Sequence, residues 1–216
     1  MIITFASQKG GTGKTTLAIA FANYISKRSK RKINVFDFDY QKSLYYKWKE
    51  DETSDSPIIY EVQTIGVDKE ELFSDFETIL KFKENEEINV FDLAGTLDPK
   101  YIDLLIYSDF IIIPFEYSDV SVKSTMVFIN FLGLIESQAA NVFIRSKYEK
   151  QYKYLNQIGM DKELLRLGKL LQSSVLKKNS LQTINTRKLT HFQNDAVRNT
   201  FEELISYINT TLKISI

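Results

Sequence analysis

The sequence predicts an α/β protein built on a mostly parallel β-sheet with helices on both faces. Short runs rich in Ile, Val and Phe alternate with longer stretches whose apolar residues recur every three or four positions. Several of the short runs are apolar almost throughout, as expected for strands buried on both faces of a parallel sheet. Strands that alternate with helices favour crossover connections and therefore parallel pairing. With 216 residues, of which 44% are hydrophobic, the chain can form a sizeable core.

Six apolar runs are expected to be the strands of this sheet. Each is bounded by polar residues or glycine and is enriched in β-branched or aromatic side chains. In chain order they cover residues 2–6, 33–38, 58–62, 88–93, 110–115 and 139–144. Because the chain has no internal repeat, low-complexity tract or linker, we expect residues 1–216 to form a single domain.

Four stretches with helical spacing are expected to cover the sheet. They are residues 15–27, 69–83, 120–135 and 195–213. The segment 146–171 is polar at first and rich in tyrosine. We expect one or two exposed helices in this segment, interrupted at Gly159.

A glycine-rich loop follows the first expected strand, and a helix is expected from about Lys14. In such loops the backbone N–H groups surround phosphate oxygens, and the helix N-terminus adds its dipole. Lys14 would reach the β- and γ-phosphates, and the Thr15 hydroxyl would bind Mg²⁺. The sequence therefore predicts a site for a nucleoside triphosphate, with these nucleotide-binding residues: Lys9, Gly10, Gly11, Thr12, Gly13, Lys14, Thr15 and Thr16.

Acidic residues stand at the ends of two expected strands. Asp37 and Asp39 close the run at residues 33–38, and Asp92 lies at the end of the run at residues 88–93. In an open parallel sheet, ligands bind at the carboxyl ends of the strands, so these carboxylates should lie beside the phosphate loop. An aspartate in this position can also be a helix cap or a turn residue. Next to a phosphate loop, carboxylates commonly hold Mg²⁺ or orient the attacking water.

Residues 9–16, Lys-Gly-Gly-Thr-Gly-Lys-Thr-Thr, resemble the deviant Walker A motif of the ParA/MinD family of ATPases. The ordinary Walker A pattern is not met, since Gln8 occupies its first glycine position. The resemblance implies a P-loop NTPase fold, ATP and Mg²⁺ as cofactors, and a homodimer that forms on ATP binding. In that family the additional lysine, here Lys9, crosses into the partner's site. The resemblance thus makes Lys9 and Lys14 the expected catalytic lysines.

Two further segments resemble the same family. Residues 37–41 look like its switch I motif, D-x-D-P-Q, and residues 92–95 look like its Walker B and switch II segment. The match implies that Asp39 positions or activates the attacking water. It also implies that Asp37 and Asp92 lie near the Mg²⁺ held by Thr15, mostly acting through water. The chain departs from the family at Tyr40 and Ala94, where proline is usual or common, which bears on switch dynamics and rate.

The base-recognition position also departs from the family. After the strand at residues 139–144 the family often has an asparagine for adenine, whereas this chain has Arg145. Residues 146–149, Ser-Lys-Tyr-Glu, faintly echo the guanine-reading motif N-K-x-D of GTPases but lack its Asn and its Asp. ATP is therefore the expected nucleotide, with GTP as the alternative. The resemblance covers most of residues 1–145 and is weak beyond them.

Charge is segregated along the chain although its formal net charge is zero. Residues 141–190 hold eleven Lys and Arg and three Asp and Glu, a net charge of +8, and the remainder carries −8. A surface of this charge suits DNA, although lysines also form ordinary solvated faces. ParA-type dimers bind DNA non-specifically through basic C-terminal residues. The resemblance therefore favours DNA contacts, which we expect at Lys177, Lys178, Arg187 and Lys188.

Composition excludes several classes of site. The chain has no cysteine, which excludes disulfides, thiolate metal sites and cysteine nucleophiles, and its single His191 leaves no histidine cluster for zinc. Neither a signal peptide nor an apolar run of about 18–20 residues is visible, and the C-terminal segment lacks the basic face of a membrane-surface helix. We therefore expect no membrane contact and a cytoplasmic protein, associated with the nucleoid if it binds DNA.

These inferences predict a ParA-like ATPase that partitions DNA, a plasmid or another cargo. Its slow ATP hydrolysis would be stimulated by a ParB-like partner, which resets the cycle. Two alternatives stay open: a positioning or conjugation-associated ATPase that acts on a protein complex, and a nucleotide-binding scaffold that no longer hydrolyses. Salt-sensitive DNA binding separates the first alternative from the expected function, and an assay of Mg²⁺-dependent hydrolysis separates the second.

Overall fold

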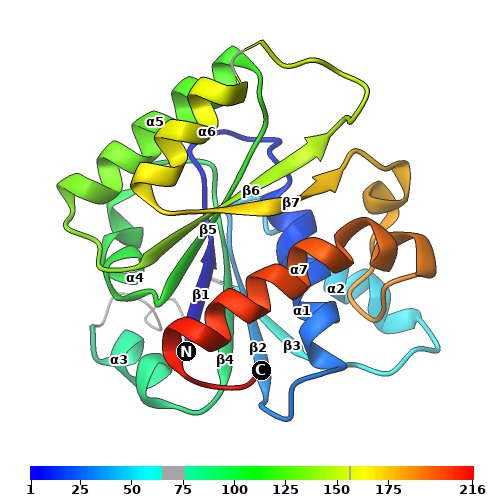
Figure 1. Cartoon of the computed structure of the whole chain (residues 1–216). Helices are drawn as coiled ribbons and strands as arrows, with labels where there is room; N and C mark the ends of the chain where they lie inside the picture. Colours follow the sequence, from blue (N-terminus) through cyan, green and yellow to red (C-terminus); the bar gives the residue numbers. More distant parts are fainter. Residues whose placement is uncertain (65–75, 156) are drawn as a thin grey trace.

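The structure, a computed structural model, describes residues 1–64, 76–155 and 157–216. Its strands form one parallel sheet in the order β3-β2-β4-β1-β5-β6-β7, with helices on both faces (Figure 1). The predicted α/β architecture is confirmed. The strands are β1 (Ile2–Phe5), β2 (Ile33–Phe38), β3 (Glu61–Thr64), β4 (Ile88–Leu93), β5 (Phe110–Phe115), β6 (Ala140–Tyr148) and β7 (Lys169–Leu176).

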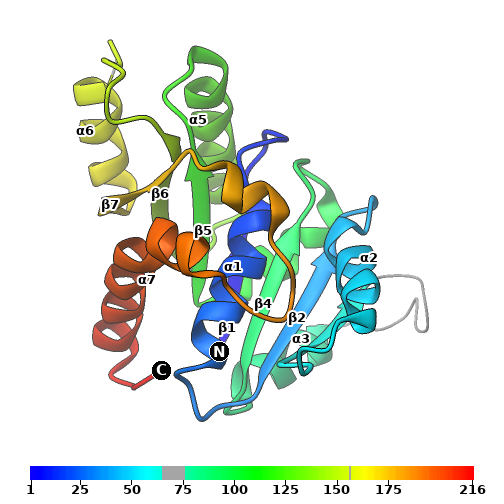
Figure 2. The same ribbon diagram turned by 90° about the vertical axis from the view of Figure 1, so that its right-hand side faces the viewer.

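The described helices pack in two layers, one on each face of the sheet (Figure 2). One layer holds α1 (Lys14–Ser26), α2 (Ser43–Glu50) and α7 (His191–Leu212). The other holds α3 (Phe76–Glu84), α4 (Ile102–Tyr107), α5 (Asp119–Leu134) and α6 (Gln157–Leu167). Each layer encloses its own hydrophobic core against the sheet, and burial of this apolar surface is the main stabilising contribution.

Successive residues of the central strands face opposite cores. In β1, Ile3 and Phe5 pack with the layer of α1 and α7, whereas Ile2 packs with the layer of α4 and α5. Every residue of β2, β4 and β5 is buried, which explains why these strands are apolar at nearly every position. The polar exceptions are Asn34 and Asp37 in β2 and Asn89 and Asp92 in β4. The two aspartates lie near the carboxyl ends of these strands.

Most element bounds agree with the sequence-based expectations. The bounds of β2, β4 and β5 are confirmed to the residue, while β3 begins three residues later than expected. Residues 69–75 of the expected helix 69–83 lie outside the described residues, and α3 covers the rest of it. The short helices α2 and α4 were not expected.

Helix α7 begins earlier than expected because Thr190 caps it. The Thr190 hydroxyl accepts the Gln193 N–H, and the Gln193 side chain accepts the Thr190 N–H.

The segment 146–171 differs from the expectation of exposed helices broken at Gly159. Strand β6 continues to Tyr148, and α6 runs through Gly159 without interruption. A Cβ at Gly159 would meet no atom within 4 Å. The glycine is therefore tolerated in the helix, at a cost of about 1 kcal/mol relative to alanine, and does not mark a break.

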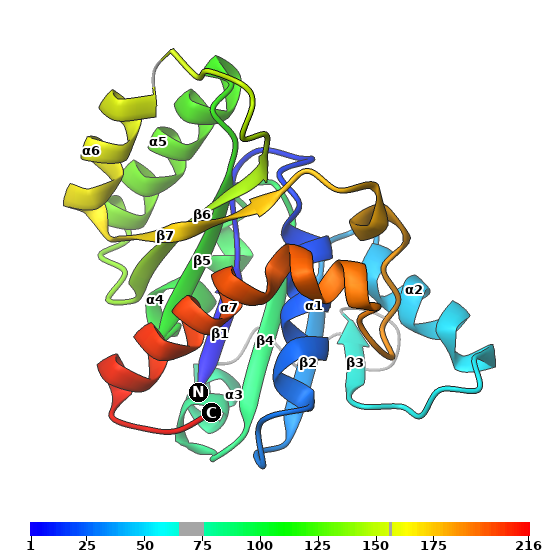
Figure 3. The ribbon, with the colours of Figure 1, turned by 45° about the vertical axis from the view of Figure 1, so that its right-hand side comes forward.

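A seventh strand, β7, forms the edge of the sheet beside β6 (Figure 3). Its sequence mixes buried Leu170, Leu171 and Val175 with polar residues, so it lacks the continuous apolar signal of the central strands. Glu203 of α7 lies against this edge. Its two carboxylate oxygens accept the backbone N–H groups of Gln172 (2.8 Å) and Ser173 (2.9 Å).

Candidate nucleotide-binding site

The loop between β1 and α1 is shaped for close approach of its backbone to a ligand. Gly11 and Gly13 have φ values of 77° and 92°, in the left-handed region that other residues rarely adopt. The Ser7 hydroxyl braces the loop, lying 3.0 Å from Thr12 Oγ1 and donating to the Lys9 carbonyl at 3.1 Å. All eight residues expected to bind nucleotide, 9–16, lie in this loop or in the first turn of α1.

Lys14 begins helix α1 and is only 6% exposed. Its Nζ donates a hydrogen bond to the Lys9 carbonyl at 3.2 Å, so the ammonium lies inside the loop. Burial lowers the pKa of Lys14, while the nearby carboxylates of Asp92 and Asp39 favour its charged form. The side chain is thus placed to meet a phosphate at the centre of the loop.

The segment after β4 lies directly against the loop at Gly95. A Cβ at Gly95 would be 3.1 Å from the Gly10 nitrogen and 3.3 Å from Lys14 Nζ. Any larger residue would therefore displace the loop or the lysine. This close contact explains the glycine at the end of the expected switch II segment.

Asp92 is fully buried beside the loop. Among the described residues, neither of its carboxylate oxygens has a hydrogen-bond partner. Burial raises the pKa of Asp92 to about 8, although the nearby Thr15 hydroxyl and Lys14 act to lower it. Buried polar atoms normally have partners, and water molecules on a Mg²⁺ ion would supply them. The site therefore fits the Mg²⁺ expected at Thr15 and Asp92.

The geometry suits an ion that takes most of its ligands from phosphate and water. The described part of the chain contains no group of three or more His, Cys, Asp or Glu side chains that could hold a metal alone. Asp92 would act on such an ion through water, which is the role expected from the sequence.

Asp37 anchors the backbone of the neighbouring segments. Its Oδ1 accepts the Asp39 N–H at 3.0 Å, and its Oδ2 accepts the Tyr45 N–H in α2 at 2.9 Å. Burial raises the pKa of Asp37 to about 6, and these two hydrogen bonds oppose the increase. Asp37 therefore orders residues 37–45, which agrees with the alternative that an aspartate in this position caps a helix or stabilises a turn.

Asp39 and Lys9 lie at the outer side of the loop. Asp39 is half-buried, and its Oδ1 accepts the Gln41 N–H at 2.9 Å. Lys9 Nζ is 3.5 Å from the hydroxyl of Ser118, the residue that caps α5, so this side chain points away from Lys14. The crossing of Lys9 into a partner's site stays a prediction.

Two residues of β6 contact the phosphate loop and were not identified from the sequence as site residues. A Cβ at Gly13 would lie 3.1 Å from Ser146 Oγ, which places Ser146 against the loop. Lys147 Nζ donates to the Gly11 carbonyl and pairs with Glu116 at 3.1 Å. Lys147 has a φ of 51°, a backbone conformation that is unfavourable for lysine. The only sequence signal was the faint likeness of residues 146–149 to a guanine-reading motif.

Arg145 does not face the loop. Its guanidinium binds Asp161 of α6 at 2.9 Å, the Tyr117 hydroxyl at 2.5 Å and the Leu171 carbonyl of β7 at 2.5 Å. The position at which the family often carries its adenine-binding asparagine therefore holds a residue that ties α6 and β7 to β6. Ser146, one residue later, is the one next to the loop.

A cavity of about 210 Å³ opens beside the phosphate loop. Its walls come from the loop, the start of α1, the end of β6 and the residues after β7. It is lined by Gly13, Thr16, Leu17, Ser146, Lys147, Val175, Leu176, Lys177, Lys178, Leu181 and Gln182.

The four residues expected to contact DNA do not share one surface. Lys177 pairs with Glu149 at 3.0 Å, and both Lys177 and Lys178 line the cavity beside the loop. Lys188 is exposed. Arg187 is 2% exposed, and the expectation that it contacts DNA is wrong for this structure.

Arg187 is held inside the molecule by α2 and the residues after it. Its Nε donates to the Asp51 carbonyl at 3.1 Å, and its Nη2 donates to the Trp48 carbonyl at 3.3 Å. The guanidinium carbon lies 5.6 Å from the Trp48 ring centroid. These contacts make Arg187 a structural residue that fixes the connection before α7.

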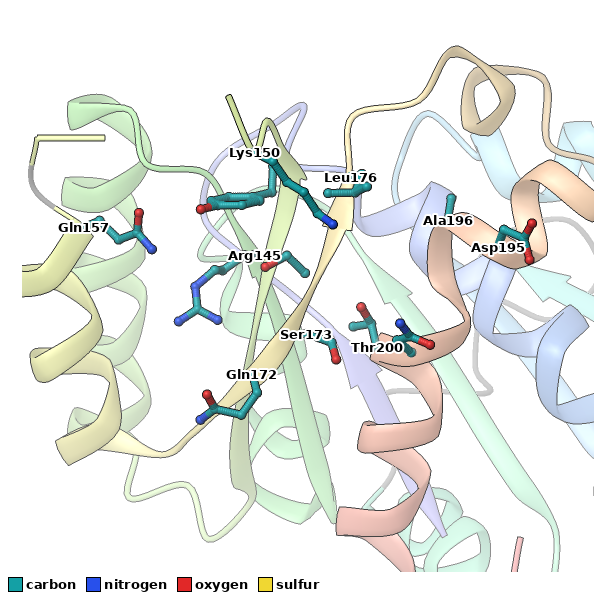
Figure 4. Close-up of a pocket in the computed structure, with 12 residues that line it drawn as sticks. Arg145, Lys150, Gln157, Gln172, Ser173, Leu176, Asp195, Ala196 and Thr200 are labelled. Carbon is teal, nitrogen blue, oxygen red and sulfur yellow. The ribbon is translucent and has the colours of Figure 1, made fainter. Parts of the chain in front are cut away.

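A larger cavity, of about 510 Å³, lies away from the phosphate loop between α6, β7 and α7 (Figure 4). Gln157, Gln172 and Thr200 from these three elements contribute to its mostly polar wall. None of the residues expected to bind nucleotide lines it. The chemistry of the site is therefore assigned to the loop and not to this cavity.

Comparison with known proteins agrees with this geometry. Residues 3–214 match the family model described as the CobQ/CobB/MinD/ParA nucleotide binding domain. No curated protein sequence matches the chain. None of the described helices is long and apolar enough to cross a membrane.

Three solved structures illustrate the similarity of fold. A plasmid partition protein from Borrelia burgdorferi B31, bound to AMPPNP, is 19% identical over 97% of this chain and 98% of its own, with a TM-score of 0.69. The cell division ATPase MinD from Pyrococcus furiosus is 16% identical over 95% and 98%, with a TM-score of 0.71. ParA of pNOB8, bound to nonspecific DNA, is 13% identical over 94% and 92%, with a TM-score of 0.57.

Proposed function

Because the chain belongs to the CobQ/CobB/MinD/ParA nucleotide-binding family, we propose that it is a Mg²⁺-dependent ATPase that acts as a homodimer in partitioning DNA or another cargo. One observation carries the proposal: the glycine loop, the buried Lys14 ammonium and the unpartnered carboxylate of Asp92 meet at one edge of the sheet. Such a loop binds phosphates, and such a carboxylate suits water on a divalent ion.

ATP and Mg²⁺, when bound, supply the phosphoryl group and the divalent charge that hydrolysis needs. The loop amides and the N-terminus of α1 hold the phosphates, and Lys14 neutralises their negative charge. The Thr15 hydroxyl would bind the Mg²⁺ directly, and Asp92 would hold it through water. Asp39 accepts a hydrogen bond from the attacking water and so orients it towards the γ-phosphate. Asp37 keeps Asp39 in place through the bond to its backbone N–H.

Dimerisation gives Lys9 its role. The side chain of Lys9 points away from its own loop, towards the cap of α5, where Ser118 is exposed. We place the dimer interface over this edge, so that Lys9 of one protomer reaches the phosphates bound by its partner. A lysine supplied in this way would couple hydrolysis to association, because neither protomer alone has the full positive charge at the phosphates.

The cavity beside the loop is proposed to take the adenine base. Ser146 and Lys147 form the wall next to Gly13, and Leu17, Val175 and Leu181 supply apolar contacts. In this arrangement Lys177, which pairs with Glu149, lies beside the bound nucleotide. ATP remains our proposal over GTP, because the chain lacks the aspartate with which the N-K-x-D motif reads guanine.

We propose that DNA binding, if the cargo is DNA, relies on the exposed lysines after β7. Lys178 directly precedes the 3-10 helix Asn179–Thr183, Lys188 lies between this helix and α7, and both lysines are exposed. The likeness of fold to a ParA bound to nonspecific DNA supports this assignment. A ParB-like partner that stimulates hydrolysis would complete the cycle, in the cytoplasm and at the nucleoid.

A second candidate is an ATPase that acts on a protein complex. Burial of Arg187 and the pairing of Lys177 with Glu149 make the expected basic surface smaller than the net charge of residues 141–190 suggests. MinD from Aquifex aeolicus, of similar fold, was solved in complex with the cell division protein MinC. For this candidate the partner would be a protein and the salt dependence of DNA binding would be absent.

Three measurements test the proposal. Release of phosphate from ATP with and without Mg²⁺ tests the enzyme, and light scattering with a slowly hydrolysed ATP analogue tests the dimer. Fluorescence anisotropy of a labelled duplex across a salt series then separates DNA from protein cargo, since the logarithm of affinity should fall with a slope of about −0.9 per phosphate contact. A wild-type chain that neither binds nor hydrolyses Mg²⁺-ATP would disprove the proposed enzyme.

A further inference from the structure

Tyr40 is an exposed residue whose side chain is nevertheless fixed by a distant segment. The residue is 67% exposed. Its hydroxyl donates to Asp98 Oδ2 at 2.8 Å, and Lys100 Nζ lies 3.4 Å from the centroid of its ring. Lys100 Nζ is also 3.9 Å from Asp98 Oδ2. The three side chains thus form one cluster that joins residues 58 positions apart in the sequence.

A second contact joins the same two segments. The hydroxyl of Tyr101 donates to the carbonyl of Phe38 in the buried interior. Tyr101 ends a single 3-10 turn, Pro99–Tyr101, which Asp98 caps by accepting the Lys100 N–H at 3.1 Å. Asp39 therefore lies between two residues, Phe38 and Tyr40, that are both bound to this turn.

We infer that Tyr40, Asp98 and Lys100 form a latch that holds switch I against the segment after switch II. The latch makes Tyr40 a positioning residue for Asp39, and this inference rests on the proposed ATPase function. Gly95, which touches the phosphate loop, and the 3-10 turn both lie in the connection between β4 and α4. Movement of one switch is therefore transmitted to the other through the latch.

The backbone at Tyr40 does not itself require tyrosine. The Lys42 N–H donates to the Asp39 carbonyl at 2.9 Å, which closes a turn with Tyr40 at its second position. Proline is favoured at that position of a turn, but it has neither a hydroxyl group nor an aromatic ring. The tyrosine therefore adds to this turn a contact with the 3-10 turn that proline could not make.

The test compares two substitutions of Tyr40 in the full-length protein. Tyr40→Phe removes the bond to Asp98 and keeps the ring beneath Lys100, whereas Tyr40→Pro keeps the turn and removes the whole latch. We expect kcat for ATP hydrolysis to fall about three- to tenfold in Tyr40→Phe and at least as much in Tyr40→Pro, with KM within twofold of the wild type. Tyr46→Phe is the control: Tyr46 is also exposed but lies in α2, outside the latch, so its substitution should leave both kcat and KM unchanged.

A double-mutant cycle separates the latch from a general loss of stability. Asp98→Asn retains a capping side chain for the 3-10 turn but weakens the bond to Tyr40. If both substitutions act on the same contact, the double variant Tyr40→Phe/Asp98→Asn should be no slower than the slower single variant. Independent, multiplicative losses of kcat would overturn the latch.

Amide hydrogen exchange decides the question without relying on turnover. Tyr40→Phe should speed exchange in residues 96–104, far along the sequence, whereas Tyr46→Phe should not. Normal kcat in both Tyr40 variants, or unchanged exchange in residues 96–104, would overturn the inference. A wild-type chain that binds ATP but does not hydrolyse it would instead overturn the proposed function, and the exchange comparison would still decide whether the latch exists.

Discussion

Asp37 and Asp92 are in-register neighbours on the adjacent parallel strands β2 and β4, yet their carboxylates have different surroundings. Asp37 accepts two backbone hydrogen bonds, and Asp92 has no partner among the described residues. Burial raises both pKa values, to about 6 and about 8. Two neighbouring carboxylates in a low-dielectric interior repel each other when both are ionised. A cation bound near the two carboxylates would therefore favour the ionised form of both.

We expect Asp92→Asn to stabilise the metal-free protein in a pH-dependent way. In the folded protein the pKa of Asp92 is about 8, above its ordinary value of 3.8. As pH rises, Asp92 therefore ionises at a lower pH in the unfolded chain than in the folded protein. In the wild type, the contribution of Asp92 to the free energy of unfolding should fall as pH rises from about 4 to about 8. Asp92→Asn removes this loss of stability. The thermal midpoint of the variant should therefore exceed that of the wild type by at least about 2–4 °C at pH 9, which corresponds to about 1 kcal/mol at this chain length.

The same substitution should reduce the stabilisation that Mg²⁺-ATP gives the wild type, because a neutral amide lacks the negative charge of the carboxylate. Asp103→Asn, at an exposed position in α4, is the matched control. Scanning calorimetry between pH 5 and 9, with and without Mg²⁺-ATP, provides the measurement. Melting curves of Asp92→Asn and wild type that shift in parallel with pH would contradict the assignment.

The two loop lysines should have separable effects. Lys14→Ala removes the buried ammonium and should abolish ATP binding, measured by titration calorimetry. Lys9→Ala should leave binding detectable but weaken ATP-dependent dimerisation and hydrolysis, because its side chain points away from its own loop. Light scattering with an ATP analogue follows the dimer. If Lys9→Ala dimerises and hydrolyses normally, the sandwich arrangement is wrong.

Asp39→Ala should trap the ATP-bound dimer. The attacking water loses its orienting carboxylate while the phosphate contacts persist, and loss of such a group typically slows turnover by about 10²–10⁴-fold. Phosphate release and light scattering should therefore diverge: turnover falls while the dimer lasts longer. Wild-type turnover in this variant, with and without a stimulating partner, would show that another group orients the water.

Arg187 and Lys188, adjacent in sequence, should behave oppositely. Arg187→Gln breaks buried charged hydrogen bonds to the carbonyls of Asp51 and Trp48 and should lower the free energy of unfolding by about 1.5–3 kcal/mol. Lys188→Gln should change it by less than about 0.5 kcal/mol. Urea denaturation gives both values.

DNA binding provides the other half of this comparison. If the exposed lysines contact phosphates, Lys178→Gln and Lys188→Gln should each reduce the salt slope of duplex binding by about 0.9. Arg187→Gln should leave that slope unchanged under conditions in which it is folded. Equal slopes in all three variants would remove Lys178 and Lys188 from the DNA surface and favour a protein cargo.

The features that the sequence predicted well are those written in consecutive residues. The phosphate loop needs glycines, lysine and threonine in a fixed order between a strand and a helix, so residues 9–16 identify it locally. The central strands are apolar along their length because both faces are buried. The position of β4 in the sheet brings Asp92 to the loop, and Asp37 is its neighbour on β2.

Features that depend on distant contacts were missed. Strand β7 has a mixed sequence, because only part of an edge strand is buried. The sequence predicts a surface cation at Arg187, but in the structure its guanidinium donates to the carbonyls of Trp48 and Asp51. Lys147 reaches the loop through a left-handed backbone conformation, which its sequence does not signal.

Glu203 has a consequence for solubility. An unpaired strand at the rim of a sheet offers its amides to any extended chain, which is a common route to aggregation. Glu203 occupies the amides of Gln172 and Ser173 with a charged group. Two copies of the chain are thereby discouraged from joining β7 to β7 at these two positions, so Glu203 protects the sheet rim as well as joining α7 to β7.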